Sequence, residues 1–178
     1  MCGGSGRRMN LPFRGEKEKP MVRVCGKRLI EHPIEAIEEI GLEILALTSP
    51  KTCETEKFLR ERGLDVVTSP GLGFVEDIVW FVREFRYANP ILIVSADIVF
   101  LKNELIRILE FYLKSTKPAI TAVKNSKNVG INIIDGYHSL ISEFQPEEVC
   151  NVRWVFNVNT REDVKIVEEI AKKFNILK

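Results

Sequence analysis

Glycines and cationic side chains are concentrated in the first twenty residues of the chain, MCGGSGRRMNLPFRGEKEKP. Gly3, Gly4 and Gly6 have no Cβ, so their backbone N–H groups can approach an anion closely and form a concave anion site. Arg8 offers a planar fork of donors and Lys19 a point charge, and both suit a polyphosphate. The functional interpretation of this pattern is a cradle for a nucleoside triphosphate, and the competing interpretation, left open by the residues alone, is a flexible basic tail. Neither a Walker loop nor a G-x-G-x-x-G dinucleotide motif is present.

Polar side chains follow two runs that are typical of strands. The apolar run PILIVS is followed by Asp97, and the run RWVFNV contains Asn157 and continues into Asn159. Ligands bind α/β sheets at the carboxyl ends of strands, and a carboxylate there can hold a hard cation such as Mg²⁺. Asp97 is therefore a candidate metal ligand, and the two Asn side chains offer donors and acceptors. The alternatives are a helix-capping Asp and Asn residues that form a turn.

Two further loops contain glycines. In SPGLGFVEDI, Gly73 lets the backbone approach a ligand, and Asp77 follows in the first turn of an expected helix. A tight turn with acids placed favourably near the helix dipole explains the same residues. Gly130 and Asn132 begin the strand-like run GINII, where Gly can mark a close backbone approach, although Gly is also common at the start of a strand.

The sequence has no recognisable nucleophile. G-x-S-x-G is absent, and the two histidines, His32 and His138, stand in no recognisable frame with a cysteine. A phosphate monoester is already largely a dianion at neutral pH, because its second pKa is about 6. An enzyme that uses such an acceptor needs positioning, charge neutralisation and a metal, and it needs no general base. The residue types at the strand ends match that requirement.

The elements that would position these residues alternate between strands and helices. We expect strands at 21–25, 42–48, 65–68, 90–95, 119–123, 130–134 and 153–158, and helices at 28–40, 52–62, 74–85, 103–114 and 160–174. Such alternation predicts an α/β fold with a mostly parallel sheet. PILIVS has the continuous apolar pattern of a strand that is buried on both faces of such a sheet. A length of 178 residues suits a single domain spanning 1–178.

Composition limits the partners. Twenty-six basic and 25 acidic residues leave a net charge of +1, so the chain has no global basic field for nucleic acid. The four cysteines have neither zinc-ligand spacing nor the pattern of a disulfide framework. No apolar run reaches membrane-spanning length, and no signal-peptide core is present. We therefore expect a cytoplasmic protein without a membrane span.

Five motifs, in order, resemble the nucleotidyltransferase A superfamily of small GT-A-like, or MobA-like, enzymes: G-G-x-G-x-R-M, E-K-P, a glycine loop before the third helix, S-x-D at a strand end, and N-x-N-T. The stretches EKPMVRVCGKRLIE, GLGFVEDI and GINII followed by FNVNTREDVKI are most similar to archaeal adenosylcobinamide-phosphate guanylyltransferases. The resemblance implies a three-layer, Rossmann-like nucleotidyltransferase (nucleotide-diphospho-sugar transferase) fold, with a mostly parallel sheet flanked by helices. It also implies transfer of GMP from GTP to adenosylcobinamide phosphate, which yields adenosylcobinamide-GDP and pyrophosphate in cobalamin biosynthesis.

The resemblance assigns catalytic roles with Mg²⁺ as cofactor. Arg8 would neutralise the leaving pyrophosphate, and Lys19 would stabilise the α-phosphate as charge develops. Asp97 would bind the metal, with Asn157 as its second ligand.

The resemblance also assigns binding roles. The glycines of the signature would cradle the GTP phosphates, and Gly73 and Asp77 would lie near the nucleoside. Gly130 and Asn132 would border the acceptor, with Asn159 beside them. The choice of GTP over other nucleotides rests on the resemblance alone.

Alternatives remain at this point. A molybdopterin-cofactor or sugar-phosphate nucleotidyltransferase shares the signature, and a non-catalytic nucleotide-binding module would show the same glycine loop. A homodimer is left open. Superfamily members generally have an apolar strand before the signature, whereas only Met1 and Cys2 precede Gly3 in this sequence. We therefore expect either a start further upstream or a sheet without that strand.

Overall fold

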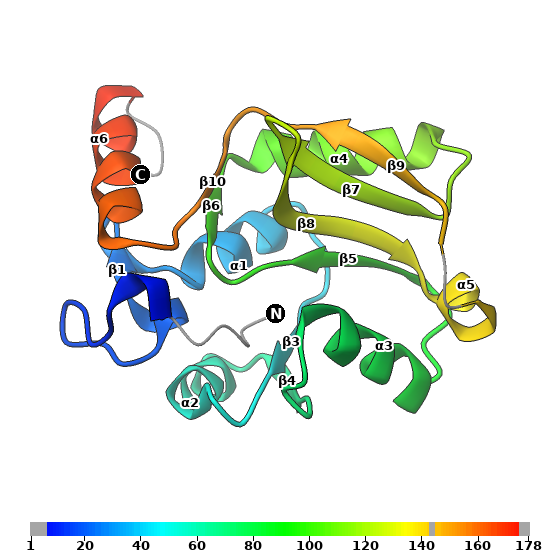
Figure 1. Cartoon of the computed structure of the whole chain (residues 1–178), viewed down its shortest axis with the longest axis horizontal. Coiled ribbons are helices and arrows are strands. Elements are labelled where there is room, and N and C mark those ends of the chain that lie inside the picture. Colours follow the sequence, from blue (N-terminus) through cyan, green and yellow to red (C-terminus); the bar gives the residue numbers. More distant parts are fainter. Residues whose placement is uncertain (1–6, 143–144, 175–178) are drawn as a thin grey trace.

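The structure, a computed structural model, describes residues 7–142 and 145–174 (Figure 1). Its helices are α1 (Glu31–Glu38), α2 (Cys53–Glu61), α3 (Phe74–Glu84), α4 (Lys102–Lys114), α5 (Gly136–Ile141) and α6 (Arg161–Phe174), with short 3-10 turns η1 (Arg7–Met9) and η2 (Lys19–Met21). Its strands are β1 (Arg23–Val24), β2 (Lys27–Arg28), β3 (Leu45–Thr48), β4 (Asp65–Thr68), β5 (Pro90–Val94), β6 (Ile98–Phe100), β7 (Ala119–Lys124), β8 (Lys127–Asp135), β9 (Glu147–Asn151) and β10 (Val155–Asn157).

The strands form one four-stranded sheet in the order β5-β8-β7-β9 and three two-stranded pairs, β1-β2, β3-β4 and β6-β10. The α/β class is confirmed, but the expectation of mostly parallel pairing is wrong for the described strands. Only β3-β4 and β7-β9 are parallel among these pairs. One of the antiparallel pairs comes from a hairpin: Asn125 and Ser126 both have positive φ, as a two-residue turn between antiparallel strands requires, and they join β7 directly to β8.

Two helix starts show how local sequence produces the elements around the site. Thr160 and Asp163 cap α6 reciprocally, because the Asp163 carboxylate accepts from the Thr160 N–H and the Thr160 hydroxyl accepts from the Asp163 N–H. At α5, the Asp135 carboxylate accepts from the His138 N–H. These caps end the preceding strands β10 and β8 and begin the helices, so the positions of the strand ends are well defined.

One apolar cluster holds the two ends of the described chain together. Met9, Val22 and Val24 from the N-terminal segment are fully buried against Val158 and Val164 near the start of α6. Burial of such side chains contributes about 1.5–3 kcal/mol each. This packing brings η1 and η2 next to the end of β10.

A second cluster fills the space between α4 and the four-stranded sheet. It includes Leu105 and Ile108 of α4, Ile120 of β7, and Ile131 and Ile133 of β8. The strand β5 lies at the edge of this sheet and is less covered than its apolar sequence predicts, since Ile93 is its one buried residue. The expectation that PILIVS is buried on both faces is therefore wrong for this structure.

Candidate active site

Four side chains that are distant in sequence meet in one polar cluster. The Lys19 ammonium lies 2.5 Å from a carboxylate oxygen of Asp97 and donates to the Asn159 carbonyl oxygen at 2.9 Å. Arg8 donates to the same Asn159 oxygen at 3.0 Å. The Lys19 side chain is 7% exposed and that of Asp97 is 31% exposed. A buried cation is thus paired with a carboxylate that solvent can reach, and Arg8 lies at the exposed side.

The residue before Lys19 explains why the lysine is held in place. The Glu18 carboxylate accepts from the backbone N–H groups of Glu54 and Thr55 and from the Thr55 hydroxyl, at 2.6–2.8 Å. These groups open α2, whose own preceding residue, Thr52, provides no side-chain cap. A carboxylate at a helix N-terminus is also favoured by the helix dipole. Sequence analysis missed Glu18, although an acid directly before a candidate catalytic lysine is visible in the E-K-P motif.

Asp97 and Asn159 are brought together by the pairing of β6 with β10. Ile98 of β6 pairs with Asn157, and the Val158 N–H donates to the Asp97 carbonyl at 2.8 Å. The backbone of Asn159 also takes part in the start of α6, because its N–H donates to the Asp163 carboxylate that caps this helix. Its side chain meanwhile faces Lys19. The same short segment therefore serves both as a helix start and as part of the polar cluster.

The Asp97 carboxylate is a ligand type that suits a magnesium ion shared with a phosphate group. Mg²⁺ is commonly held by one or two carboxylates together with substrate phosphates. Within the described residues, no group of three or more His, Cys, Asp or Glu side chains could hold a metal. The Asn157 amide nitrogen donates to the Val129 carbonyl at 3.2 Å, which leaves its carbonyl oxygen as the atom available to a ligand. Both oxygens are of the type that Mg²⁺ prefers, although the hydrogen bonds of the described residues join Asp97 to Lys19 and Asn157 to Val129.

The second glycine loop is shaped by Asp77. This residue is buried, and its carboxylate accepts from the N–H groups of Gly71 and Leu72 at 3.0 and 3.1 Å. Gly71 has a φ of +75°, and a Cβ there would lie 3.3 Å from the Ser49 side chain. At Gly73 a Cβ would collide with the carboxylate of Glu76. Asp77 thus organises the loop, and Gly71 brings it against the residue that follows β3.

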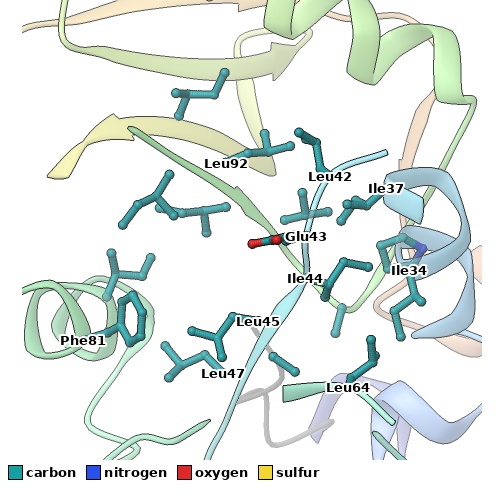
Figure 2. Close-up of a pocket in the computed structure, with 18 of the residues that line it drawn as sticks. Ile34, Ile37, Leu42, Glu43, Ile44, Leu45, Leu47, Leu64, Phe81 and Leu92 are labelled. Carbon is teal, nitrogen blue, oxygen red and sulfur yellow. The ribbon is translucent and has the colours of Figure 1, made fainter. Parts of the chain in front are cut away.

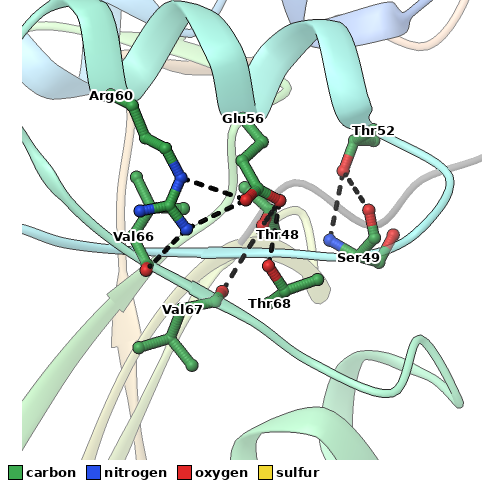
Figure 3. Close-up of polar contacts among 8 residues, drawn as sticks. All are labelled: Thr48, Ser49, Thr52, Glu56, Arg60, Val66, Val67 and Thr68. Atoms are coloured by element: carbon green, nitrogen blue, oxygen red, sulfur yellow. Dashed lines mark hydrogen bonds and ion pairs between the residues drawn. The ribbon is translucent and has the colours of Figure 1, made fainter.

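Ser49 is a polar residue that sequence analysis missed. Its hydroxyl is buried and has no hydrogen-bond partner among the described residues. The Thr52 hydroxyl holds the Ser49 backbone by contacts to its N–H and carbonyl at 3.1 and 3.0 Å (Figure 3). An unsatisfied buried hydroxyl beneath a glycine loop is a candidate contact for a polar ligand group.

Glu56 connects the carboxyl ends of β3 and β4. It accepts from the hydroxyls of Thr48 and Thr68 at 3.1 and 2.9 Å, and Arg60 donates to it from the next turn of α2 (Figure 3). The Arg60 and Thr68 hydrogen bonds lower the pKa of the Glu56 carboxyl. This network fixes the carboxyl ends of β3 and β4 beside Ser49.

Gly130 and Asn132 have structural partners. Gly130 has a φ of +83°, and a Cβ there would lie 2.6 Å from the Ser95 hydroxyl oxygen, so glycine permits the close approach of β8 to the segment before Asp97. The Ser95 N–H donates to the Gly130 carbonyl at 2.8 Å. The Asn132 carbonyl oxygen accepts from Asn128 at 3.1 Å.

An open hollow of about 280 Å³ lies beside Asn157, lined also by Lys124, Lys127 and Asn128. Burial lowers the pKa of Lys124, whose ammonium donates to the Val155 carbonyl and lies 4.0 Å from the centre of the Phe156 ring. Sequence analysis singled out neither lysine, because nothing in their local sequence distinguishes them from surface lysines.

Gly3, Gly4 and Gly6 lie outside the described residues.

The sequence profile of the MobA-like NTP transferase domain matches residues 1–145. The chain belongs to this family. A MobA-like nucleotidyltransferase takes a nucleoside triphosphate and an acceptor, so the chain is an enzyme with these two kinds of substrate. This finding also removes the non-catalytic binding module from the alternatives.

Two curated relatives are similar in sequence to this MobA-like chain along nearly its whole length. The adenosylcobinamide-phosphate guanylyltransferase of Methanocaldococcus jannaschii is 27% identical over 199 positions, which cover 97% of this chain and 96% of the relative. The bifunctional protein GlmU of the same organism is 25% identical and covers 97% of this chain but 41% of the relative.

The solved structures show the fold. Molybdopterin-guanine dinucleotide biosynthesis protein A from Archaeoglobus fulgidus superposes with a TM-score of 0.71 at 19% identity, with 97% of this chain and 96% of that chain covered. The inositol-1-phosphate CTP transferase from T. maritima superposes with a TM-score of 0.70 at 13% identity, with 96% of this chain and 94% of that chain covered. The expected nucleotidyltransferase fold is confirmed. No helix in the described part of the chain is long and apolar enough to cross a membrane.

Proposed function

We propose that the protein transfers GMP from GTP to adenosylcobinamide phosphate, with Mg²⁺ as cofactor. The observation that carries this proposal is the likeness to the M. jannaschii guanylyltransferase along nearly the full length of both chains. The polar cluster supports it, because a buried lysine, an arginine and an accessible carboxylate meet where a triphosphate and a metal would need them.

The roles that the resemblance implies agree with the charge and exposure of these side chains. Lys19 is buried and stabilises charge that develops on the α-phosphate, whereas Arg8 lies at the exposed side and neutralises the leaving pyrophosphate. Asn159 orients both cations through one carbonyl oxygen. A magnesium ion held by Asp97, with the Asn157 oxygen beside it, would add charge neutralisation on the phosphates.

The two substrates have separate candidate surfaces. Ser49 and the Asp77-supported loop are suited to the nucleoside, because a buried unsatisfied hydroxyl and close backbone approach favour a polar planar ligand. The hollow beside Asn157 carries Lys124 and Lys127 and is suited to the acceptor phosphate. The acceptor phosphate attacks the α-phosphorus of GTP, the new P–O bond forms, and pyrophosphate leaves with the electron pair of the broken bond.

The experiment is pyrophosphate release from each of the four ribonucleoside triphosphates, with Mg²⁺, in the presence and absence of adenosylcobinamide phosphate. We expect release with GTP, dependent on the corrinoid, and formation of adenosylcobinamide-GDP. Release that is independent of the corrinoid, or faster with another nucleotide, would contradict the proposal.

A molybdopterin-cofactor or sugar-phosphate nucleotidyltransferase is the second candidate. It is favoured by the likeness to the A. fulgidus molybdopterin-guanine dinucleotide protein and to GlmU. The same assay with molybdopterin or a sugar 1-phosphate in place of the corrinoid distinguishes the candidates, since only the true acceptor will drive pyrophosphate release.

A further inference from the structure

Residues 9–18 form the segment that joins the two cations of the polar cluster, because Arg8 precedes it and Lys19 follows it. Two residues of this segment, Asn10 and Arg14, have a φ of +53°. Residues other than glycine rarely adopt such a conformation, and it persists where surrounding contacts hold it in place. The contacts made by this segment therefore help to decide where the two cations lie.

Arg161, the first residue of α6, contacts three backbone carbonyl groups of this segment. Its Nε donates to the Met9 carbonyl at 3.2 Å, and its Nη2 donates to the carbonyls of Asn10 at 2.7 Å and Pro12 at 3.4 Å. Its guanidinium also lies 4.9 Å from the centre of the Phe13 ring. A planar guanidinium with five donors in a fixed fork can serve several acceptors at once. Arg161 therefore ties the beginning of the segment to α6.

A second contact ties the later part of the segment to the same helix. The Arg14 guanidinium donates to both carboxylate oxygens of Glu168, at 2.8 and 3.1 Å, and to the Arg23 carbonyl at 2.7 Å. Each of the two residues with positive φ is thus involved in a contact with a side chain of α6. Of these two contacts, the one made by Arg161 lies next to Arg8 in the sequence.

Arg8 is held at its side chain and at its backbone by neighbouring residues. The Asn159 carbonyl oxygen accepts from the Arg8 guanidinium at 3.0 Å, and Arg161 holds the carbonyl of Met9, the next residue. Asn159 and Arg161 lie on either side of Thr160, whose hydroxyl caps α6. Because this cap defines where the helix begins, one rigid element positions both parts of the arginine.

We propose that Arg161 is a positioning residue, which fixes the η1 turn and thereby places the Arg8 guanidinium for the leaving pyrophosphate. This inference rests on the proposed function, in which Arg8 neutralises that group. A cation that is already in place when charge develops stabilises the transition state without the cost of moving it there. Loss of Arg161 should therefore lower kcat more than it raises the KM for GTP.

The first test is steady-state pyrophosphate release from GTP, with Mg²⁺ and adenosylcobinamide phosphate, in Arg161→Ala and in the control Lys165→Ala. Lys165 is exposed on the same helix and pairs there with Glu162, so the control removes an equal charge from α6. We expect Arg161→Ala to lower kcat by about tenfold while the KM for GTP changes by less than about threefold. We expect the control to retain both values. An increased KM for GTP with kcat unchanged would overturn the proposal.

A double-mutant cycle tests whether Arg161 acts through Arg8. Arg8→Ala removes the side chain that Arg161 is proposed to position. Adding Arg161→Ala to that variant should then lower kcat by less than about twofold further, because the two changes remove the same interaction. A further loss as large as in the wild-type background would assign Arg161 a general structural role and contradict the proposal.

Amide hydrogen exchange of the free protein tests the contact without any substrate. The N–H groups of Phe13 and Glu16 each donate to the carbonyl of the other residue at 3.0 Å. We expect Arg161→Ala to speed exchange at these two amides by about fivefold or more, while α4 exchanges as in the wild type. Unchanged exchange at Phe13 and Glu16 would overturn the proposal. If the wild type releases no pyrophosphate with any acceptor, the proposed function fails, whereas this measurement still decides whether Arg161 holds the segment.

Discussion

The polar cluster around Lys19 differs from the cavity between β3 and β5 in how closely its side chains contact one another (Figure 2). The Lys19 ammonium donates to both Asp97 and Asn159, and the ion pair with Asp97 joins residues 78 positions apart. The cavity has a volume of about 580 Å³ and is lined mostly by apolar side chains, among them Ile37, Phe81 and Leu92. The comparison teaches that the side chains able to do chemistry are positioned by the β6-β10 pairing and by the buried cluster that includes Met9 and Val158, whereas the side chains around the cavity border open space.

The largest expected effect concerns the polar cluster. Asp97→Asn keeps the size of the side chain but removes its charge, and we expect turnover of GTP to fall by about a hundredfold or more. The measurement is steady-state pyrophosphate release. The matched control is Asp65→Asn, an exposed aspartate at the start of β4, which should retain activity. Activity retained in Asp97→Asn would remove this residue from the catalytic roles.

The next largest effect, on stability, tests whether the wall of the cavity between β3 and β5 is less tightly packed than the buried cluster under α4. Ile131→Ala in the fully buried cluster under α4 should cost about 2–5 kcal/mol of unfolding free energy, because it leaves a cavity. Leu92→Ala in the wall of this cavity should cost about 1 kcal/mol or less of unfolding free energy, since that side chain is half-buried beside open space. Urea denaturation of both variants measures the difference. Equal losses of unfolding free energy in the two variants would mean that the cavity is closed in solution.

A smaller effect concerns the support of Lys19. Glu18→Ala removes the carboxylate that caps α2, and we expect a loss of about 1–2 kcal/mol together with reduced kcat, because the adjacent lysine loses its anchor. Glu61→Ala, an exposed residue at the other end of α2, is the control and should change stability by less than about 0.5 kcal/mol. Unchanged kcat in Glu18→Ala would show that Lys19 is held by its other contacts alone.

The smallest effect is the pH dependence of stability that comes from α1. This helix borders the cavity through Ile34, and its His32 contacts the Val24 carbonyl oxygen. Burial lowers the pKa of His32 below its ordinary value of 6.5. The unfolded chain therefore binds a proton more readily, so stability present above pH 6.5 is lost as the pH falls from 6.5 toward the folded-state pKa. Denaturation at pH 7.5 and 5.5 should show a smaller loss for His32→Gln than for the wild type. His138→Gln serves as the comparison, and an identical loss in all three proteins would exclude His32 as the cause.

Much of the fold and part of the site could be predicted from sequence. The apolar periodicity located most helices and strands, because period and turn residues act locally. Asp97 and Asn159 were recognised as strand-end residues for the same reason. The direction of strand pairing was not predictable in this way: Asn125 and Ser126 form the tight turn between β7 and β8 without the glycine that usually signals one.

By itself, the sequence determined the α/β class, the family and the residue types available for chemistry, since these depend on local pattern and ordered motifs. Only the tertiary structure decided that Lys19 faces Asp97, that Glu18 caps a helix 36 positions away, and that Asp77 supports its own loop. It also decided that, among the strands of the described residues, β5 pairs with β8 alone. The physical reason is that hydrogen bonds and burial between distant segments depend on how the elements pack, and no local pattern encodes that packing.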